Sequence, residues 1–231
     1  MRRSAARHVG AFRKACQTLK ELYQKFNADP AAFNDWQPEF PHPRSYRSLD
    51  DEKEEVHFRY ASVLEYNKLL FVAKTDAGEQ VCIKFAQTYS VEAHRKCAER
   101  GTSPKLRGSE RVVGGWHMVV MDLLEGYQCL HDVKHRLSDG EKGRLMEELR
   151  SKLAALHQDG LVHGDVRDAN VMVRKEPFAW KLVDFDWSGR LGEVRYPMNI
   201  NRGPRLRRPE GAVDGQLVLA DHDVRMLDML F

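Results

Sequence analysis

The sequence predicts an α+β fold in which a small antiparallel β-sheet precedes a mainly helical region. Apolar residues between positions 55 and 85 occur in three short bursts that are typical of strands, at 56–60, 68–73 and 81–85. Residues 75–78, Thr-Asp-Ala-Gly, separate the last two bursts and are typical of a hairpin turn. From residue 138 onward, leucines recur instead at helical intervals.

One helix and one more strand complete the predicted N-terminal region. Residues 90–100 have helical composition, and Gly101 ends this helix. Residues 117–121 are mostly apolar and are typical of a strand. We therefore expect the sheet to carry a single helix.

The second half begins with a helix whose start is specified by a capping box. Ser138 and Glu141 match the S-x-x-E pattern, and Gly160 ends the helix. Its apolar face is formed by Leu145, Leu149, Leu153 and Leu156. The elements expected after it are strands at 171–173 and 181–183, a loop rich in Gly, Arg and Pro to about residue 215, and a helix at 221–231.

Length and composition bound the domain organisation. With 231 residues, of which 42% are hydrophobic, the chain can bury one core or the two unequal lobes of one unit. Residues 1–26 are basic, with Glu21 as their one acidic residue, and their apolar residues have helical spacing. Residues 29–48 are rich in proline and predict a connector without regular structure. We expect this helix and connector at 1–49 and a folded domain at 50–231.

Charge and cysteine usage exclude several classes of protein. The 37 basic and 34 acidic residues leave a net charge of +3, so no global field directs the chain to nucleic acid or to a membrane. The four cysteines lack the spacing of a zinc site or a disulfide scaffold. No apolar run is long enough to span a bilayer. We expect an intracellular protein, cytoplasmic or nuclear, although the basic N-terminal helix leaves mitochondrial import open.

Two motifs in the second half combine the residue types that phosphoryl transfer requires. Residues 163–170, His-Gly-Asp-Val-Arg-Asp-Ala-Asn, have the pattern H-x-D-x-x-x-x-N, and residues 183–186, Val-Asp-Phe-Asp, follow after two short strands. Together they resemble the catalytic loop and the D-F-G motif of protein kinases. The resemblance implies that Asp165 is the base or positioning group for the acceptor hydroxyl and that Asn170 and Asp184 bind magnesium.

The predicted sheet carries the second part of this resemblance. Residues 81–84, Val-Cys-Ile-Lys, resemble the V-A-I-K strand, which implies that Lys84 binds the phosphates of ATP. In the helix that follows, Glu92 would pair with Lys84, and Glu99 is the alternative partner. The resemblance also implies a hinge whose main-chain groups bind adenine, at Met121, Asp122 and Leu124.

The resemblance predicts a bilobal protein-kinase-like fold. A small antiparallel β-lobe with one helix would occupy about 50–124, and a truncated, mainly α-helical C-lobe about 125–231. In the final helix, Asp223 resembles the aspartate that anchors the catalytic loop from beneath. The sequence given has no residues after Phe231 that could form the last helices of a typical large lobe. The resemblance therefore implies a small, atypical member similar to kinase-like proteins of fungi.

Several positions depart from the kinase pattern. The stretch before Lys84 lacks G-x-G-x-x-G, so another backbone segment would have to cover the phosphates. Gly164 stands where many regulated kinases carry Arg, and Asp186 replaces the glycine of D-F-G. Arg167 replaces the usual lysine and could still neutralise the transferring group. Five arginines in the next loop form either a partner-facing surface or a site for an acidic substrate: Arg195, Arg202, Arg205, Arg207 and Arg208.

We expect an ATP- and Mg²⁺-dependent phosphotransferase. Lys84, Asp165 and Arg167 would act in the transfer of the γ-phosphoryl group to a hydroxyl, which the resemblance implies is on a protein Ser or Thr. A small-molecule acceptor stays open. A pseudokinase that serves as an interaction module, or a nucleic-acid-binding protein that uses the basic helix, are the alternatives from other classes. The expected partners are ATP and the acceptor, with no membrane, and the sequence does not indicate the oligomeric state.

Overall fold

The computed structural model describes residues 2–28, 40–51, 53–201, 203, 206 and 208–231, and the chain divides into two units, 1–42 and 43–231. The first unit contains the predicted basic helix, α1 (Arg2–Ala28). Its apolar side chains Val9, Phe12 and Leu19 are all more than half exposed. Within the described ranges, no helix combines the length and the apolar character needed to cross a bilayer.

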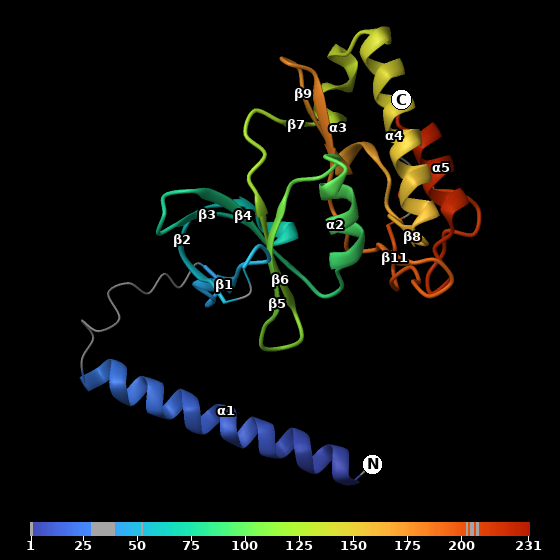
Figure 1. The fold of residues 1–231 in the computed structure, drawn as a ribbon. Coiled ribbons are helices and arrows are strands. Elements are labelled where there is room, and N and C mark those ends of the chain that lie inside the picture. Colours follow the sequence, from blue (N-terminus) through green and yellow to red (C-terminus); the bar gives the residue numbers. More distant parts are fainter. Residues whose placement is uncertain (1, 29–39, 52, 202, 204–205, 207) are drawn as a thin grey trace. The chain divides into compact units, whose positions relative to one another are not determined.

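The second unit begins with a six-stranded antiparallel sheet (Figure 1). The strands lie in the order β1-β2-β3-β4-β6-β5. Their bounds are β1 (Ser45–Arg47), β2 (Glu55–Glu65), β3 (Leu70–Thr75), β4 (Gln80–Ala86), β5 (Leu106–Arg111) and β6 (His117–Asp122). Four of them, β2, β3, β4 and β6, confirm the predicted sheet.

The sequence pattern does not predict the other two strands. β1 lies in the segment expected to have no regular structure, so that expectation is wrong for residues 45–47. The second compact unit begins at residue 43. Three residues are too few to show an alternating pattern; β1 is fixed by pairing with β2 and by burial of Tyr46. β5 lies at the sheet edge, and most of its residues are polar or glycine.

A row of buried aromatic rings on the sheet fixes the strand that carries Lys84. Its members are Tyr46, Phe58, Tyr60, Phe71 and Phe85, and successive ring centroids are separated by 6.2, 5.2, 5.5 and 6.0 Å. Such ring pairs contribute about 0.5–1.5 kcal/mol each beyond their buried area. The row ends at Phe85, directly after Lys84 in β4.

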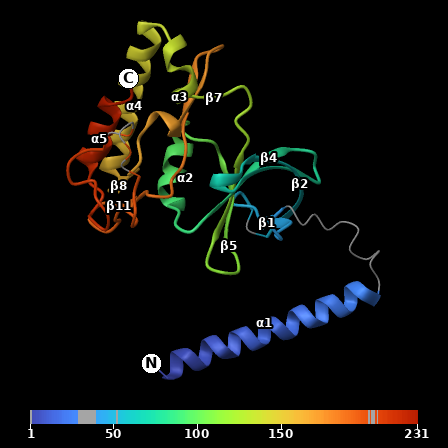
Figure 2. The same cartoon turned by 180° about the vertical axis from the view of Figure 1, so that it is seen from behind.

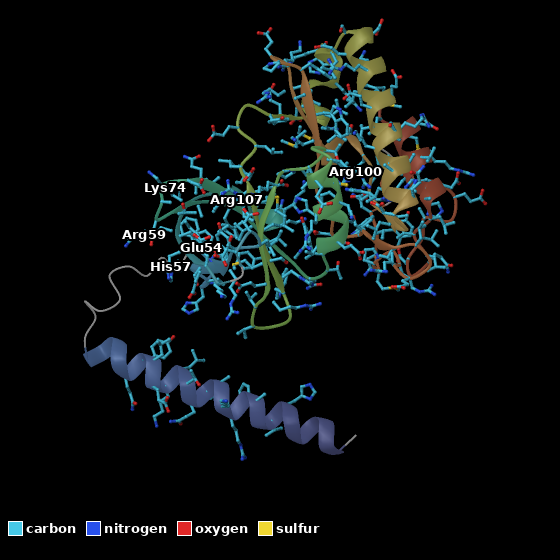
Figure 3. The ribbon with its side chains drawn as sticks, viewed as in Figure 1. Glu54, His57, Arg59, Lys74, Arg100 and Arg107 are labelled. Carbon is cyan, nitrogen blue, oxygen red and sulfur yellow. The ribbon has the colours of Figure 1, made fainter. Side chains whose placement is uncertain are left out.

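Helix α2 (Val91–Glu99) lies between the sheet and the helical lobe, as the two opposite views agree (Figures 1 and 2). The side chains on its buried face are Ala93, His94 and Cys97. Arg100, labelled in Figure 3, follows the helix. It forms a 2.6 Å ion pair with Asp159 of the helical lobe. The helix is thus fixed to both lobes.

The helical lobe is built on α4 (Asp139–Gln158), which begins with the predicted capping box and buries the four predicted leucines. The other helices of this lobe are α3 (Leu130–Val133), η3 (Lys134–Arg136), η4 (Asp168–Asn170) and α5 (Ala220–Asp228). Two small antiparallel sheets complete it: β7 (Gln128–Cys129) with β9 (Val171–Arg174) and β10 (Ala179–Leu182), and β8 (Leu161–Val162) with β11 (Gly189–Arg190).

A column of rings connects α2 to the loop that follows β8. His94 stacks on Phe185 with ring centroids 4.7 Å apart, and Phe185 contacts His163 at 5.1 Å. His94 Nε2 lies 2.8 Å from the carbonyl oxygen of Pro104, which can only accept, so Nε2 donates. Nδ1 then accepts from the hydroxyl of Tyr89 at 2.7 Å. The imidazole is therefore neutral and fully hydrogen-bonded.

This buried imidazole makes stability depend on pH. Burial lowers the pKa of His94 from 6.5 to about 4, so between these values the unfolded chain binds a proton that the folded chain does not. The free energy of unfolding should therefore fall as the pH is lowered from about 6.5 to about 4, by up to about 3 kcal/mol from this group. Urea denaturation of His94→Phe should show lower stability at pH 7 but a flatter pH profile; an equally steep profile would contradict the account.

Gly164 allows the loop after β8 to pass close to a neighbouring segment. Its φ is +84°, and a Cβ at this position would lie 2.6 Å from the carbonyl oxygen of Trp187. Gly160, four residues earlier, also has a positive φ, +74°, but nothing lies within 4 Å of its Cβ position. A comparison of the two positions therefore distinguishes the cost of the left-handed backbone from the cost of steric overlap.

Alanine substitutions should resolve these two costs. Gly160→Ala should lower the free energy of unfolding by about 1–2 kcal/mol, because only the left-handed conformation is penalised. Gly164→Ala should lower it by about 3 kcal/mol or more, because the Trp187 backbone must also move. Denaturant titration of both variants measures the difference, and equal losses would show that the close approach does not matter.

Candidate active site

The loop between β8 and η4, which carries the predicted catalytic residues, is held in place by α5. Asp223 is fully buried, and its carboxylate accepts hydrogen bonds from the backbone N–H groups of His163 and Gly164, both at 2.8 Å. Nε2 of His157 lies 3.0 Å from the same carboxylate. Because removal of this carboxylate would leave buried donors without a partner, the loop depends on it.

Lys84 reaches from β4 to the segment that follows β10. Its Nζ lies 2.7 Å from Oδ1 of Asp184 and 2.5 Å from Oδ1 of Asp186, and its side chain is 6% exposed. Burial by itself would lower the pKa of Lys84, but the two carboxylates outweigh burial and raise it. Lys84 is therefore a buried ammonium ion that links the two lobes.

The two carboxylates beside Lys84 are not equivalent. Burial alone would raise the pKa of Asp184, but Lys84 outweighs burial and holds this pKa below its usual value. Burial, followed by the charge of Asp184, raises the pKa of Asp186. Asp184 also has a φ of +72°, which is unusual for a residue other than glycine and is found most often at functional sites.

The predicted pair between Lys84 and Glu92 is wrong. Glu92 Oε1 lies 2.9 Å from Nη2 of Arg190, and the alternative partner Glu99 pairs with Lys96 at 3.7 Å. Glu92 is one residue, or about 100° of helix rotation, from the buried face of α2. The composition of this segment predicts the helix, but it does not predict the side of the helix on which each glutamate lies.

Asp165 lies at the centre of a hydrogen-bond network. Its Oδ2 accepts from Nε of Arg167 at 3.0 Å and from Nδ2 of Asn170 at 2.8 Å. Its Oδ1 accepts from Nη2 of Arg208 at 2.9 Å. The side chain of Arg208 is 5% exposed, and its guanidinium group lies 4.6 Å from the ring centroid of Trp187. An acceptor hydroxyl would therefore have to share or displace one of these contacts.

Asn170 has the orientation expected of a metal ligand. Its Nδ2 donates to both the main-chain oxygen and Oδ2 of Asp165, at 2.9 and 2.8 Å. Its Oδ1 is buried, and no group in the described part of the chain hydrogen-bonds to it. A buried amide oxygen of this kind fits a hard cation such as Mg²⁺. The main-chain oxygen of Asn170 accepts from Val183, directly before Asp184, so the two predicted ligands lie on neighbouring segments.

A magnesium site of this type needs few protein ligands. Across the described residues, no group of three or more His, Cys, Asp or Glu side chains could hold a metal without help. Mg²⁺ usually takes one or two protein ligands and fills its remaining positions with phosphate and water. The donor set of Asn170 and Asp184 therefore fits Mg²⁺ that is bound together with a nucleotide.

The predicted adenine-binding segment lies at the end of β6. The backbone N–H of Asp122 donates to the carbonyl of Lys105 at 2.9 Å, so this amide is already used. The Asp122 side chain pairs with Arg107 at 2.6 Å. Met121 is buried in β6, and Leu124 follows the strand. The binding of adenine by other main-chain groups of this segment stays a prediction.

A short turn lies where the sequence lacks a glycine-rich loop. The 3-10 helix η2 (Tyr66–Lys68) connects β2 to β3, and Leu69, with a φ of +48°, completes the turn. The carbonyl of Leu69 accepts from the N–H of Phe85, one residue after Lys84. Lys68 helps to lower the pKa of Asp184. The turn therefore brings a second cation to the neighbourhood of Lys84, which sequence reasoning missed.

The arginine-rich loop contributes one described residue to the site. Arg208 binds Asp165, whereas Arg195 donates to the carbonyl of Gly215 at 2.9 Å. Arg202, Arg205 and Arg207 lie outside the described residues. The sequence shows the basic cluster but contains no signal that selects Arg208 from it.

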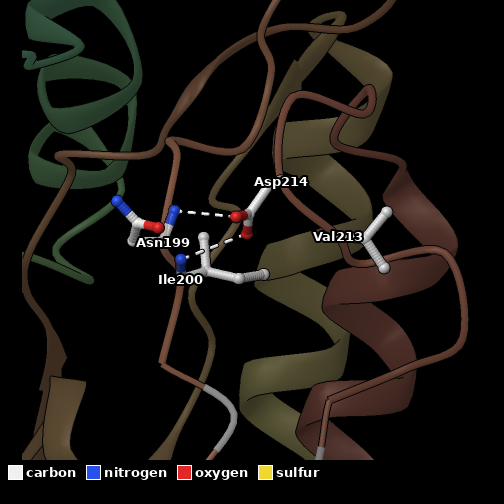
Figure 4. Close-up of a pocket in the computed structure, with 4 residues that line it drawn as sticks. All are labelled: Asn199, Ile200, Val213 and Asp214. Atoms are coloured by element: carbon white, nitrogen blue, oxygen red, sulfur yellow. Dashed lines mark hydrogen bonds between the residues drawn. The ribbon is translucent and has the colours of Figure 1, made fainter.

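A cavity of about 580 Å³ in the same loop is separate from this chemistry (Figure 4). Its lining residues are Asn199, Ile200, Val213 and Asp214. The carboxylate of Asp214 accepts from the backbone N–H groups of Asn199 and Ile200, at 2.8 and 3.2 Å. These bonds stabilise the loop, and none of the predicted site residues lines the cavity.

Of the residues predicted to act on the phosphates, the metal and the acceptor, all but Glu92 are thus brought together. Lys84, Asp165, Asn170 and Asp184 meet between the lobes with Arg167 beside them, whereas Glu92 turns away. Sequence reasoning missed the contacts of Asp186 with Lys84 and of Arg208 with Asp165.

Comparison with curated proteins finds short matches to kinases. A probable serine/threonine-protein kinase of Dictyostelium discoideum is 33% identical over 72 residues, which cover 30% of this chain and 14% of the relative. The human hormonally up-regulated neu tumor-associated kinase is 31% identical over 99 residues, 41% of this chain and 14% of the relative. The serine/threonine-protein kinase STE20 of Saccharomyces cerevisiae is 29% identical over 99 residues, 42% of this chain and 10% of the relative. The matched parts therefore span at most 14% of these relatives.

The fold itself is shared over a longer stretch. A scan against models of known protein families finds no match. Among solved structures, the kinase PK-1 of the Cydia pomonella granulovirus superposes with a TM-score of 0.61 over 74% of this chain and 65% of that chain, at 16% identity. The chain therefore has a protein-kinase-like fold, and parts of its sequence are similar to those of kinases.

Proposed function

We propose that this protein is an ATP- and Mg²⁺-dependent phosphotransferase. The observation that carries the proposal is the convergence of one buried lysine from the sheet lobe with two aspartates and an asparagine from the helical lobe: Lys84, Asp165, Asn170 and Asp184. These groups supply one cation, two carboxylates and one free amide oxygen. Phosphoryl transfer requires such a set, because its catalysis consists mainly of positioning and charge neutralisation.

Each residue has a distinct task in this mechanism. Lys84 binds the α- and β-phosphates, and Asp165 orients the acceptor hydroxyl and takes its proton as the new oxygen–phosphorus bond forms. The bond between the γ-phosphorus and the leaving oxygen of ADP breaks in line. Arg167, 3.0 Å from Asp165, neutralises charge on the transferring group. Asn170 and Asp184 would hold Mg²⁺, which neutralises phosphate charge when it is bound.

The acceptor we propose is a serine or threonine hydroxyl of a protein. Two of the matched relatives are named as serine/threonine-protein kinases, which supports this choice. Arg208 donates to Oδ1 of Asp165, the carboxylate that is proposed to bind this hydroxyl. A small hydroxyl-bearing molecule is the alternative acceptor within the same reaction class.

A pseudokinase is the second candidate function. Two observations favour it: the turn at Tyr66–Lys68 has no glycine to approach phosphates closely, and both oxygens of Asp165 already have partners. Such a protein would keep the fold and bind a partner without transferring phosphate. The two candidate functions differ in whether the γ-phosphoryl group of ATP is transferred to an acceptor.

The Asp165→Asn variant tests the proposed role of the carboxylate. An amide cannot take the hydroxyl proton, so transfer of ³²P from γ-labelled ATP to casein, used as a general Ser/Thr acceptor, should fall by about 100-fold or more. The affinity for Mg-ATP should change little, because the proposed role of Asp165 is toward the acceptor and not the nucleotide. Asp76→Asn, the same change in the exposed β3–β4 turn, is the matched control.

The outcomes are distinct. Full transfer activity in Asp165→Asn, with normal activity in Asp76→Asn, would contradict the assignment. Mg-ATP binding by the wild type without transfer to any protein, small alcohol or water would favour the pseudokinase.

A further inference from the structure

We propose that Asp186, rather than a glutamate of α2, holds Lys84 in position for the nucleotide phosphates. The inference rests on the proposed function, since it assigns the residue that positions the phosphate-binding lysine. It gives a role to the aspartate that occupies the last position of the D-F-D motif, where the kinase motif has glycine.

The first step is the need of Lys84 for a permanent counter-ion. The side chain of Lys84 is 6% exposed, and Asp184 and Asp186 form the ion pairs that the structure gives its Nζ, at 2.7 and 2.5 Å. A buried ammonium ion without a partner is strongly unfavourable. Before the phosphates of a nucleotide reach Lys84, at least one carboxylate must therefore stay beside it.

The second step is that the two aspartates have different roles. Asp184, together with Asn170, is the carboxylate proposed to bind Mg²⁺, so its charge is shared with the metal when nucleotide is bound. Asp186 is not needed in that donor set, and its Oδ1 also lies within hydrogen-bond distance of Lys84. Asp186 can therefore keep Lys84 charged and extended while Asp184 binds the metal.

The third step is that α2 cannot easily supply a replacement. Glu92 pairs with Arg190, and its side chain is 47% exposed. Glu92 is one residue, or about 100° around the helix, from the buried face, so α2 would have to rotate to bring Glu92 toward Lys84. That rotation would withdraw His94 from its stack on Phe185 and break its hydrogen bonds to Tyr89 and Pro104. The packing of α2 thus opposes an ion pair between Lys84 and Glu92.

The fourth step is that the backbone around Asp186 is held in place. The hydroxyl of Thr88 donates to the main-chain oxygen of Asp186 at 2.8 Å, and the N–H of Ser90 donates to that of Phe185 at 3.0 Å. Both donors lie in the connection from β4 to α2, so the strand that carries Lys84 and the residue that pairs with it are fixed to each other. Asp186 is therefore a positioning residue.

Two amide substitutions test this inference directly on the full chain: Asp186→Asn and Glu92→Gln. Each removes one negative charge with little change of shape. We expect Asp186→Asn to weaken Mg-ATP binding, measured by calorimetry, at least tenfold, and Glu92→Gln to change it less than twofold. Asp186→Glu, which restores the charge, should recover part of the loss. The Mg²⁺ concentration for half-maximal ATP binding should stay the same in Asp186→Asn, because a positioning role does not involve the metal.

Each outcome decides the question. A tenfold loss in Glu92→Gln with normal binding in Asp186→Asn would overturn the inference while leaving the proposed function intact. A changed Mg²⁺ requirement in Asp186→Asn would overturn it in favour of a metal-ligand role. No Mg-ATP binding by the wild type would remove both the proposed function and the anchoring role. If Asp186→Asn fails to fold by circular dichroism, the Glu92→Gln result alone still contradicts or supports the inference.

Discussion

The ion pairs between Lys84 and the aspartates of the D-F-D motif are the interaction on which the rest of the site depends. Lys84 belongs to a central strand of the sheet, whereas Asp184 and Asp186 belong to the helical lobe. These ion pairs therefore connect the two lobes. These ion pairs are buried, and a buried ion pair offsets the cost of desolvation only when the surrounding packing holds the two groups in good geometry. The aromatic row behind β4 supports the lysine, and the ring column from His94 to His163 supports the aspartates.

The helical lobe shows the same dependence of chemistry on buried support. Asp223 fixes the backbone at His163 and Gly164, two residues before Asp165. Gly164 in turn passes so close to Trp187 that a side chain there would overlap the backbone. An arginine at this position, as in many regulated kinases, would not fit this packing. The departure at residue 164 is thus explained by the approach of the D-F-D segment to the loop.

Local patterns predicted most of the fold, because the signals of its longer elements are local. The capping box and leucine spacing of α4 and the hairpin between β3 and β4 depend on residues close in sequence. β1 and β5 were missed, because a three-residue strand and a polar edge strand are defined by their partners. The site motifs were recognisable by their spacing. The partner of Lys84 was not, because the rotation of α2 is set by the packing of His94 against Phe185. Asp186 and Arg208 likewise acquire their contacts only in the folded chain.

The central claim is that the buried cluster is a Mg-nucleotide site, and thermal unfolding with and without Mg-ATP tests it most directly. A ligand that binds the folded state stabilises it by about 2.7 kcal/mol at 100 times its Kd. The account predicts a rise in Tm with millimolar Mg-ATP that disappears when Mg²⁺ is omitted and when Asp184 is replaced by alanine. No rise in the wild type, or an equal rise in Asp184→Ala, would contradict it.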